Sequence, residues 1–120
     1  MGPRNAIAVA LMLLAGCAAP AMPDAFAENL GGWHRTAQRD LPGTERIRIA
    51  AYEGPGRLEG RIYQLSSSAV ALDRARQWQP APDTVCFYKG RYFVVVKWQT
   101  AERKALQTFV AELQKRLEKK

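Results

Sequence analysis

The chain has 120 residues and carries 18 Lys and Arg against 11 Asp and Glu, a formal charge of +7. A chain of this size folds as one modest domain, and its core is too small to surround a deep pocket. The basic residues are scattered along the sequence, which favours a basic surface that only keeps the protein soluble over a dedicated patch that binds polyanions.

The N-terminus has the pattern of a secretory signal. Arg4 precedes an uncharged apolar run over residues 6–15 (AIAVALMLLA), and small residues follow it. A positive start, a short apolar stretch and small residues are typical of a signal peptide. The run is shorter than the roughly 20 apolar residues that a membrane-spanning helix needs. We therefore expect an exported protein.

The end of this run resembles the bacterial lipobox, the motif at which the lipoprotein signal peptidase cleaves. Residues 14–17 read LAGC, with two small residues before the cysteine. The resemblance implies cleavage between Gly16 and Cys17, and acylation of the Cys17 thiol and of the new amino group. Residues 1–16 are then the signal peptide. Residues 17–32 would form a flexible tether and residues 33–120 a single domain.

A second cleavage site competes with the lipobox. Residues 25–27 (AFA) match the A-x-A pattern of the ordinary signal peptidase, which would cut between Ala27 and Glu28. Residues 1–27 would then be lost, and a soluble protein without a lipid would be released. The sequence leaves both sites open.

The remainder of the chain predicts four strands and two helices. Residues 33–43 are polar and irregular, and they end in a Pro-Gly turn. Alternating side chains predict strands at residues 46–52 and 57–65, and a helix follows at 66–78 after a run of serines. A second hairpin is expected at residues 84–88 and 91–98, and a last helix begins after Thr100.

Both halves of this region follow the order strand, turn, strand, helix. We therefore expect an α+β fold, a ββαββα pseudo-repeat with a four-stranded antiparallel sheet and both helices on one face. The strand over residues 92–96 is apolar on both faces, which places it at the centre. Residues 46–118, closing on GRYFVVVKW and a terminal helix, resemble small uncharacterised domains that bacteria export. That resemblance implies no particular activity.

The sequence contains no recognisable catalytic or metal-binding constellation. His34 has no Cys, His or Asp close to it in the chain, and it is interpreted as a surface residue. Cys86 lies in a predicted strand and is interpreted as a buried thiol that is unpaired once Cys17 is acylated or removed. We expect no catalytic residue, metal or other cofactor.

Aromatic and basic residues share the predicted strands, and they give the candidate binding residues. These are Arg46, Arg48, Arg61 and Tyr63. A sheet surface of this kind can hold a peptide, a glycan or a partner protein; nucleic acid is not expected for an exported protein.

The sequence therefore predicts a small, non-enzymatic lipoprotein of the bacterial cell envelope. It would be held at the membrane through Cys17, face the periplasm, and bind or support another envelope component, a protein or a peptidoglycan or other glycan. The first alternative is a soluble periplasmic or secreted ligand-binding domain that begins at Glu28. A third hypothesis is an enzyme that uses His34 or Cys86.

Overall fold

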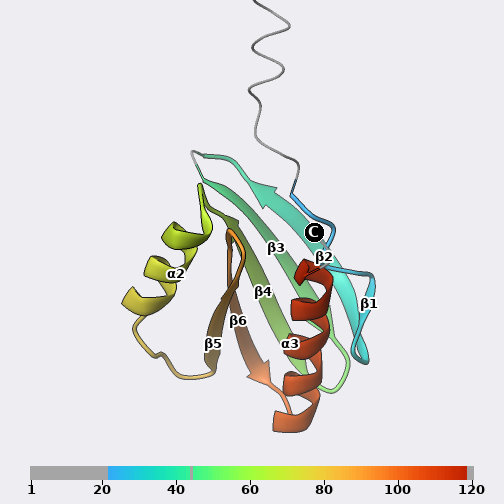
Figure 1. The fold of residues 1–120 in the computed structure, drawn as a ribbon. Helices are drawn as coiled ribbons and strands as arrows, with labels where there is room; N and C mark the ends of the chain where they lie inside the picture. Colours follow the sequence, from blue (N-terminus) through green and yellow to red (C-terminus); the bar gives the residue numbers. More distant parts are fainter. Residues whose placement is uncertain (1–21, 44, 119–120) are drawn as a thin grey trace, which may run out of the picture.

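The computed structural model describes residues 22–43 and 45–118. Within this part of the chain, six antiparallel strands form one curled sheet in the order β1-β2-β3-β4-β6-β5, accompanied by two helices (Figure 1). The strands are β1 (Asn29–Leu30), β2 (Trp33–Leu41), β3 (Arg46–Glu53), β4 (Arg57–Gln64), β5 (Thr84–Lys89) and β6 (Tyr92–Thr100). The helices are α2 (Ser68–Gln77) and α3 (Arg103–Glu118).

The expected four-stranded ββαββα fold is wrong, because the sheet extends further towards the N-terminus. The polar stretch that we expected to be irregular forms β2, which pairs with β3 from His34 to Leu41, with one irregularity between Arg35 and Ala37. Most β2 side chains are exposed, so the segment shows no apolar alternation. Its place in the sheet comes from backbone hydrogen bonds, which do not depend on the side-chain pattern.

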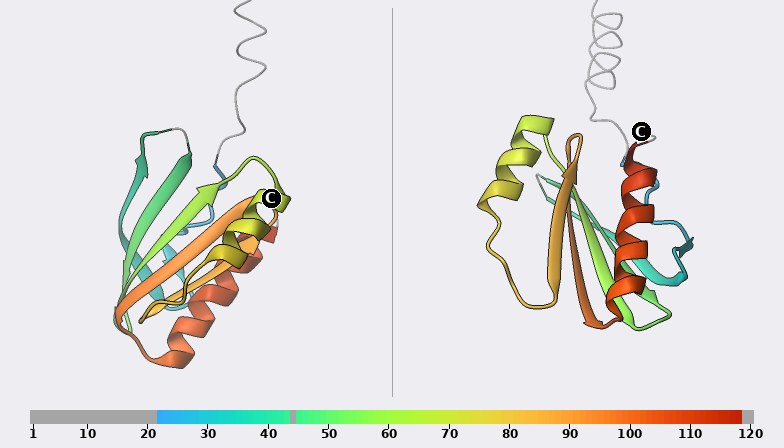
Figure 2. Two further views of the ribbon diagram at one scale, coloured as in Figure 1. Left: turned by 90° about the vertical axis from the view of Figure 1, so that its left-hand side faces the viewer. Right: turned by 60° about the horizontal axis from the view of Figure 1, so that its bottom comes forward.

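The two helices pack on opposite faces of the sheet, which corrects the expectation that both lie on one face. Successive side chains of a strand point to opposite faces. In β6, Val94 and Val96 belong to the core that includes Phe109 and Leu113 of α3. Phe93 and Val95 belong to a second core with Ala71 of α2. Figure 2 (right) shows β5 and β6 running between the two helices.

We call the face beneath α3 the inner face and the face beneath α2 the outer face. The strand expected at the centre, β6, lies between β4 and the edge strand β5. Its apolar residues on both faces are explained by helices on both sides rather than by a central position in the strand order. The chain runs from β4 through α2 to the edge strand β5, and β6 then returns beside β4.

Local capping and amphipathicity explain both helices. The Ser67 hydroxyl accepts a hydrogen bond from the backbone N–H of Val70 at 3.2 Å, which caps α2 as the run of serines predicted. Prolines at 80 and 82 follow its end. The apolar stripe of α3 buries Phe109, Leu113 and Leu117 completely or almost completely.

A segment before β1 belongs to the folded domain, although the sequence placed it in a tether. Residues 22–28, which we call the strap, cross the inner face between the sheet and α3. Ala25 and Phe26 are fully buried in the core there. The folded part of the described chain thus begins at the strap rather than at residue 33.

Candidate functional site

The strap is bound to the domain through its backbone carbonyl groups. Arg35 of β2 donates to the Phe26 carbonyl at 2.6 Å, and the Tyr52 hydroxyl donates to the Ala27 carbonyl at 2.6 Å. From α3, Arg116 donates to the carbonyls of Asp24 at 2.7 Å and Ala25 at 3.0 Å. Since these bonds satisfy polar groups beside an apolar core, the strap is anchored along most of its length.

The Phe26 ring occupies a space that the sheet leaves open for it. Gly60 of β4 lies beneath the ring, and a Cβ atom at this position would come within 2.8 Å of the ring edge. Such a distance is shorter than van der Waals contact, so only glycine allows the ring to lie there. The ring also contacts Tyr52, with the two centroids 6.2 Å apart.

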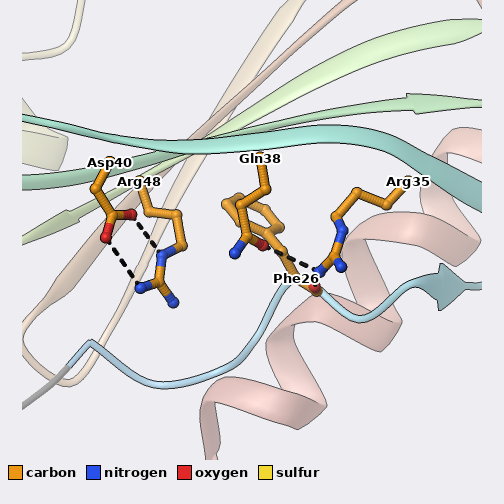
Figure 3. A network of polar contacts seen from close by, with 5 residues as sticks. All are labelled: Phe26, Arg35, Gln38, Asp40 and Arg48. Carbon is orange, nitrogen blue, oxygen red and sulfur yellow. Dashed lines mark hydrogen bonds and ion pairs between the residues drawn. The ribbon is translucent and has the colours of Figure 1, made fainter.

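Arg48, one of the candidate binding residues, lies on this inner face and has a partner within the chain. Its guanidinium donates to both carboxylate oxygens of Asp40, at 2.7 and 3.2 Å (Figure 3). This hydrogen bond raises the pKa of Arg48 and lowers the pKa of Asp40. Arg46 is exposed on the same face, two residues earlier in β3. The geometry therefore places Arg48 in a structural ion pair.

Arg61 and Tyr63 lie on the opposite, outer face. The register explains the division: Arg48 stands opposite Ile62, whereas Arg61 stands opposite Ile49. Directly opposed residues share one face of a sheet. The four candidate residues therefore do not form one surface. A sequence pattern gives the alternation within each strand, but it does not give the register that aligns two strands.

A cleft of about 750 Å³ opens on the outer face beside α2 and the loop that follows it. Its lining includes both candidates on this face, Arg61 and Tyr63, together with Glu59, Trp78, Val95 and Lys97. The Arg61 side chain donates from Nε to Glu59 Oε1 at 3.0 Å, and this bond raises the pKa of Arg61. The Arg61 side chain remains 40% exposed and the Glu59 side chain 43% exposed.

Aromatic rings form one wall of the cleft. Phe93 packs beneath Tyr63 and Trp78, with ring centroids at 5.8 and 5.9 Å. The guanidinium of Arg74 lies 5.9 Å from the centre of the Tyr63 ring and pairs with Glu45 of the β2–β3 connection. The cleft thus presents fixed aromatic surfaces beside charged groups that remain open to solvent.

Sequence reasoning missed Trp78 and Lys97 as members of this site. Trp78 is the last residue of the predicted helix; its ring packs on Phe93 and also borders the cleft. Lys97 stands opposite Glu59 because β6 pairs with β4. The order of the strands along the chain does not predict that pairing, because β5, and not β6, is the next strand after β4 and α2.

The residues considered for catalysis do not come together. His34 is exposed on β2, where its Nδ1 lies 3.1 Å from Asn29 Oδ1. Cys86 is partly buried on β5, and burial raises the pKa of its thiol, which opposes formation of a nucleophilic thiolate. Three strands lie between β2 and β5, about 19 Å at the usual strand spacing. The lining of the cleft includes neither histidine nor cysteine.

The described residues offer no arrangement of His, Cys, Asp and Glu that could hold a metal ion. Neither of the described helices is long and apolar enough to cross a membrane. Gly16 and Cys17, the expected sites of cleavage and acylation, lie outside the described residues. Ala27 and Glu28, the alternative cleavage site, lie in the strap.

Comparison with known proteins gives no relative: no protein-family model, curated protein or solved structure matches the chain.

Proposed function

We propose that the protein is a non-enzymatic lipoprotein of the bacterial envelope that is anchored through Cys17 and binds another envelope component in its outer-face cleft. The burial of Phe26 is the observation that carries the anchoring part of this proposal. Cleavage between Gly16 and Cys17 keeps the whole strap in the mature protein. Cleavage between Ala27 and Glu28 would remove Phe26 from the core and leave the space above Gly60 empty.

The alternative, a soluble domain beginning at Glu28, requires the fold to survive this loss. Removing a large buried aromatic side chain costs about 3–5 kcal/mol, while whole domains are stable by only about 5–15 kcal/mol. Arg35 and Arg116 would also lose the strap carbonyls to which they donate. For these reasons, the soluble form ranks second.

The binding part of the proposal is supported by the chemistry of the cleft. Aromatic walls with a few convergent polar groups are the usual lining of ligand sites in proteins. Here Tyr63 and Trp78 supply apolar surface, and Arg61, Glu59 and Lys97 supply charge of both signs. This combination suits a protein segment or a glycan, both of which carry apolar faces beside hydrogen-bonding groups.

The anchoring is tested by the intact mass of the mature protein purified from its own host. We expect a chain that begins at Cys17 and carries the added mass of acyl chains. A Cys17→Ala variant is the control, and it should lose the lipid mass and leave the membrane fraction. A mature chain that begins at Glu28 without added mass would contradict the proposal.

Binding is tested in the same host by a photo-crosslinking residue placed in the cleft. Gln99 is suitable because it lines the cleft and is exposed. Lys104, which is exposed at the start of α3, is the matched control. We expect a defined protein or glycan adduct from position 99 and none from position 104. Equal, diffuse labelling from both positions would contradict a cleft-specific partner.

A further inference from the structure

The strap enters the domain at one end of the sheet. Met22 lines a hollow of about 350 Å³ together with Asp40, Leu41 and Arg46, at the end of β2 and the start of β3. The strap then passes Arg116, near the C-terminal end of α3, and continues past Tyr52 towards β1. We call this end of the molecule, where β2 ends and β3 begins, the entrance end; it is uppermost in Figure 1.

Only a short piece of chain separates Met22 from Cys17. Residues 18–21 lie between them. An extended chain spans at most about 3.3–3.6 Å per residue, so five residue steps reach no more than about 18 Å in any conformation. A tether that continued to residue 32, as the sequence predicted, would reach about 50 Å.

The domain is longer than this reach. Strand β4 has 8 residues between the two ends of the sheet, which corresponds to about 26 Å at the usual rise per residue. If the opposite end faced the lipid, Met22 would lie about 26 Å from the headgroups, beyond the reach of a chain whose lipid is buried in the bilayer.

From these lengths we infer that the membrane surface is a docking partner of the domain: the lipid on Cys17 holds the entrance end against the phosphate headgroups and holds the cleft away from them. This inference rests on the proposed acylation of Cys17. The partner of the entrance end is the lipid headgroup layer that contains the anchor.

The charges at the entrance end fit a phosphate layer. Arg46 is exposed there, and Arg91 follows the β5–β6 turn at the same end. The carboxylates of Asp40 and Glu118 are paired with Arg48 and Lys89, so both are neutralised by cations of the domain. Basic groups close to a lipid surface are attracted by its phosphates.

The cleft lies towards the opposite end. Its lining includes Glu53 at the end of β3, Arg57 at the start of β4 and Gln99 near the end of β6. These strand ends lie in the lower part of Figure 1, just above the start of α3. The same short connection that docks the entrance end therefore presents the cleft to components that lie above the membrane surface.

The test compares two turn prolines in the acylated, full-length mature protein. Pro42 lies in the turn between β2 and β3, and Pro55 lies in the turn between β3 and β4; both are exposed. Each is replaced by cysteine in a Cys86→Ala background and labelled with a fluorophore. The protein is reconstituted into phosphatidylethanolamine–phosphatidylglycerol vesicles that contain a lipid with a nitroxide on its headgroup.

We expect quenching of the label at Pro42→Cys to be several-fold stronger than at Pro55→Cys. Equal quenching at both positions, or stronger quenching at position 55, would overturn the inference while leaving the lipoprotein proposal intact. Failure to float with vesicles and absence of acyl mass would instead overturn the proposed function, so the two failures are distinguishable.

A longer connection tests the cause of the orientation. Inserting a flexible Gly/Ser segment of about 15 residues between Ala21 and Met22 lengthens the reach beyond the size of the domain. We expect the insertion to keep the protein on the vesicles and to remove most of the difference between the two labels. A difference that persists unchanged would overturn the assignment of orientation to the short connection.

Discussion

The two faces of the sheet are formed by the same strands, and they differ in what covers them. The inner face has small residues at its middle, Ala50 and Gly60, and the Phe26 ring fills the space above them. On the outer face, the small residue is Ala51, which follows Ala50 in β3, and the cleft lies above it. In the described part of the chain, one shallow surface is therefore occupied by the protein's own strap and the other remains open.

Because of this difference, we expect the inner face to determine the stability of the fold and the outer face to determine binding. On the inner face, side chains contact other parts of the chain, and their removal is expected to weaken the fold. On the outer face, the charged side chains of the cleft are more exposed, from 40% for Arg61 to 69% for Arg57, and are expected to contribute little to folding. Substitutions on the two faces should consequently affect different measurements.

The largest expected effect comes from Phe26→Ala, measured by urea unfolding of a chain that begins at Ala18. We expect a loss of about 3–5 kcal/mol in the free energy of unfolding, because a fully buried aromatic ring is replaced by a cavity. Val70→Ala on the exposed side of α2 is the control, and it should change stability by less than about 0.5 kcal/mol. A loss of less than about 1 kcal/mol for Phe26→Ala would show that the strap is dispensable.

The second effect comes from Gly60→Ala, which adds a methyl group beneath the Phe26 ring. We expect a loss of about 1–3 kcal/mol from overpacking. If the ring is the obstacle, Phe26→Leu should relieve part of this cost, so the double variant should be more stable than the sum of the single losses predicts. Strict additivity of the two losses would contradict the direct contact.

The sequence predicted the elements from Arg46 onwards well, and the physical reason is local. Alternation defined β3 and β4, the apolar stripe defined α3, and the run of serines gave the cap of α2. Two elements were missed because their signal is not local. Strand β2 is held by backbone pairing to β3 with mostly exposed side chains. The strap is short and shows no apolar periodicity, and only the surrounding structure shows that Phe26 has a place in the core.

The candidate site was predicted in part. Arg61 and Tyr63 do line a cleft, because they share one side of a single strand, and that follows from alternation alone. Arg46 and Arg48 were grouped with them, although the register places the even-numbered residues of β3 on the other face. Lys97 was missed for the same reason, since its proximity to Glu59 depends on the pairing of β6 with β4. Strand pairing between distant segments is the information that the pattern lacks.

A smaller effect is expected from Tyr52→Phe, which removes the hydrogen bond to the Ala27 carbonyl. The expected loss at neutral pH is about 0.5–1.5 kcal/mol. Burial raises the pKa of Tyr52 from 10.0 to about 12, so the folded state favours the neutral phenol. Its contribution is fully present below about pH 10 and is lost as the pH rises through about 12.

This pH dependence gives a specific measurement. Thermal unfolding followed between pH 9 and pH 12 should show a steeper loss of stability for the unmodified chain than for Tyr52→Phe. Tyr88→Phe is the control, since Tyr88 is 40% exposed on β5. If Tyr52→Phe and the unmodified chain lose stability in parallel, the phenol of Tyr52 is not held neutral by the fold.

The smallest expected effect on stability comes from Arg61→Ala on the outer face. The change should stay below about 0.5 kcal/mol, because the ion pair with Glu59 is close to 40% exposed at both ends and water screens it. The same substitution removes a charged group from the lining of the cleft, so adduct formation from the photo-crosslinking residue at position 99 should fall several-fold. Arg103→Ala, at the exposed start of α3, should leave both measurements unchanged.

A strong loss of stability with Arg61→Ala would mean that the outer face is used for folding as the inner face is. Unchanged crosslinking would instead place the partner elsewhere on the domain.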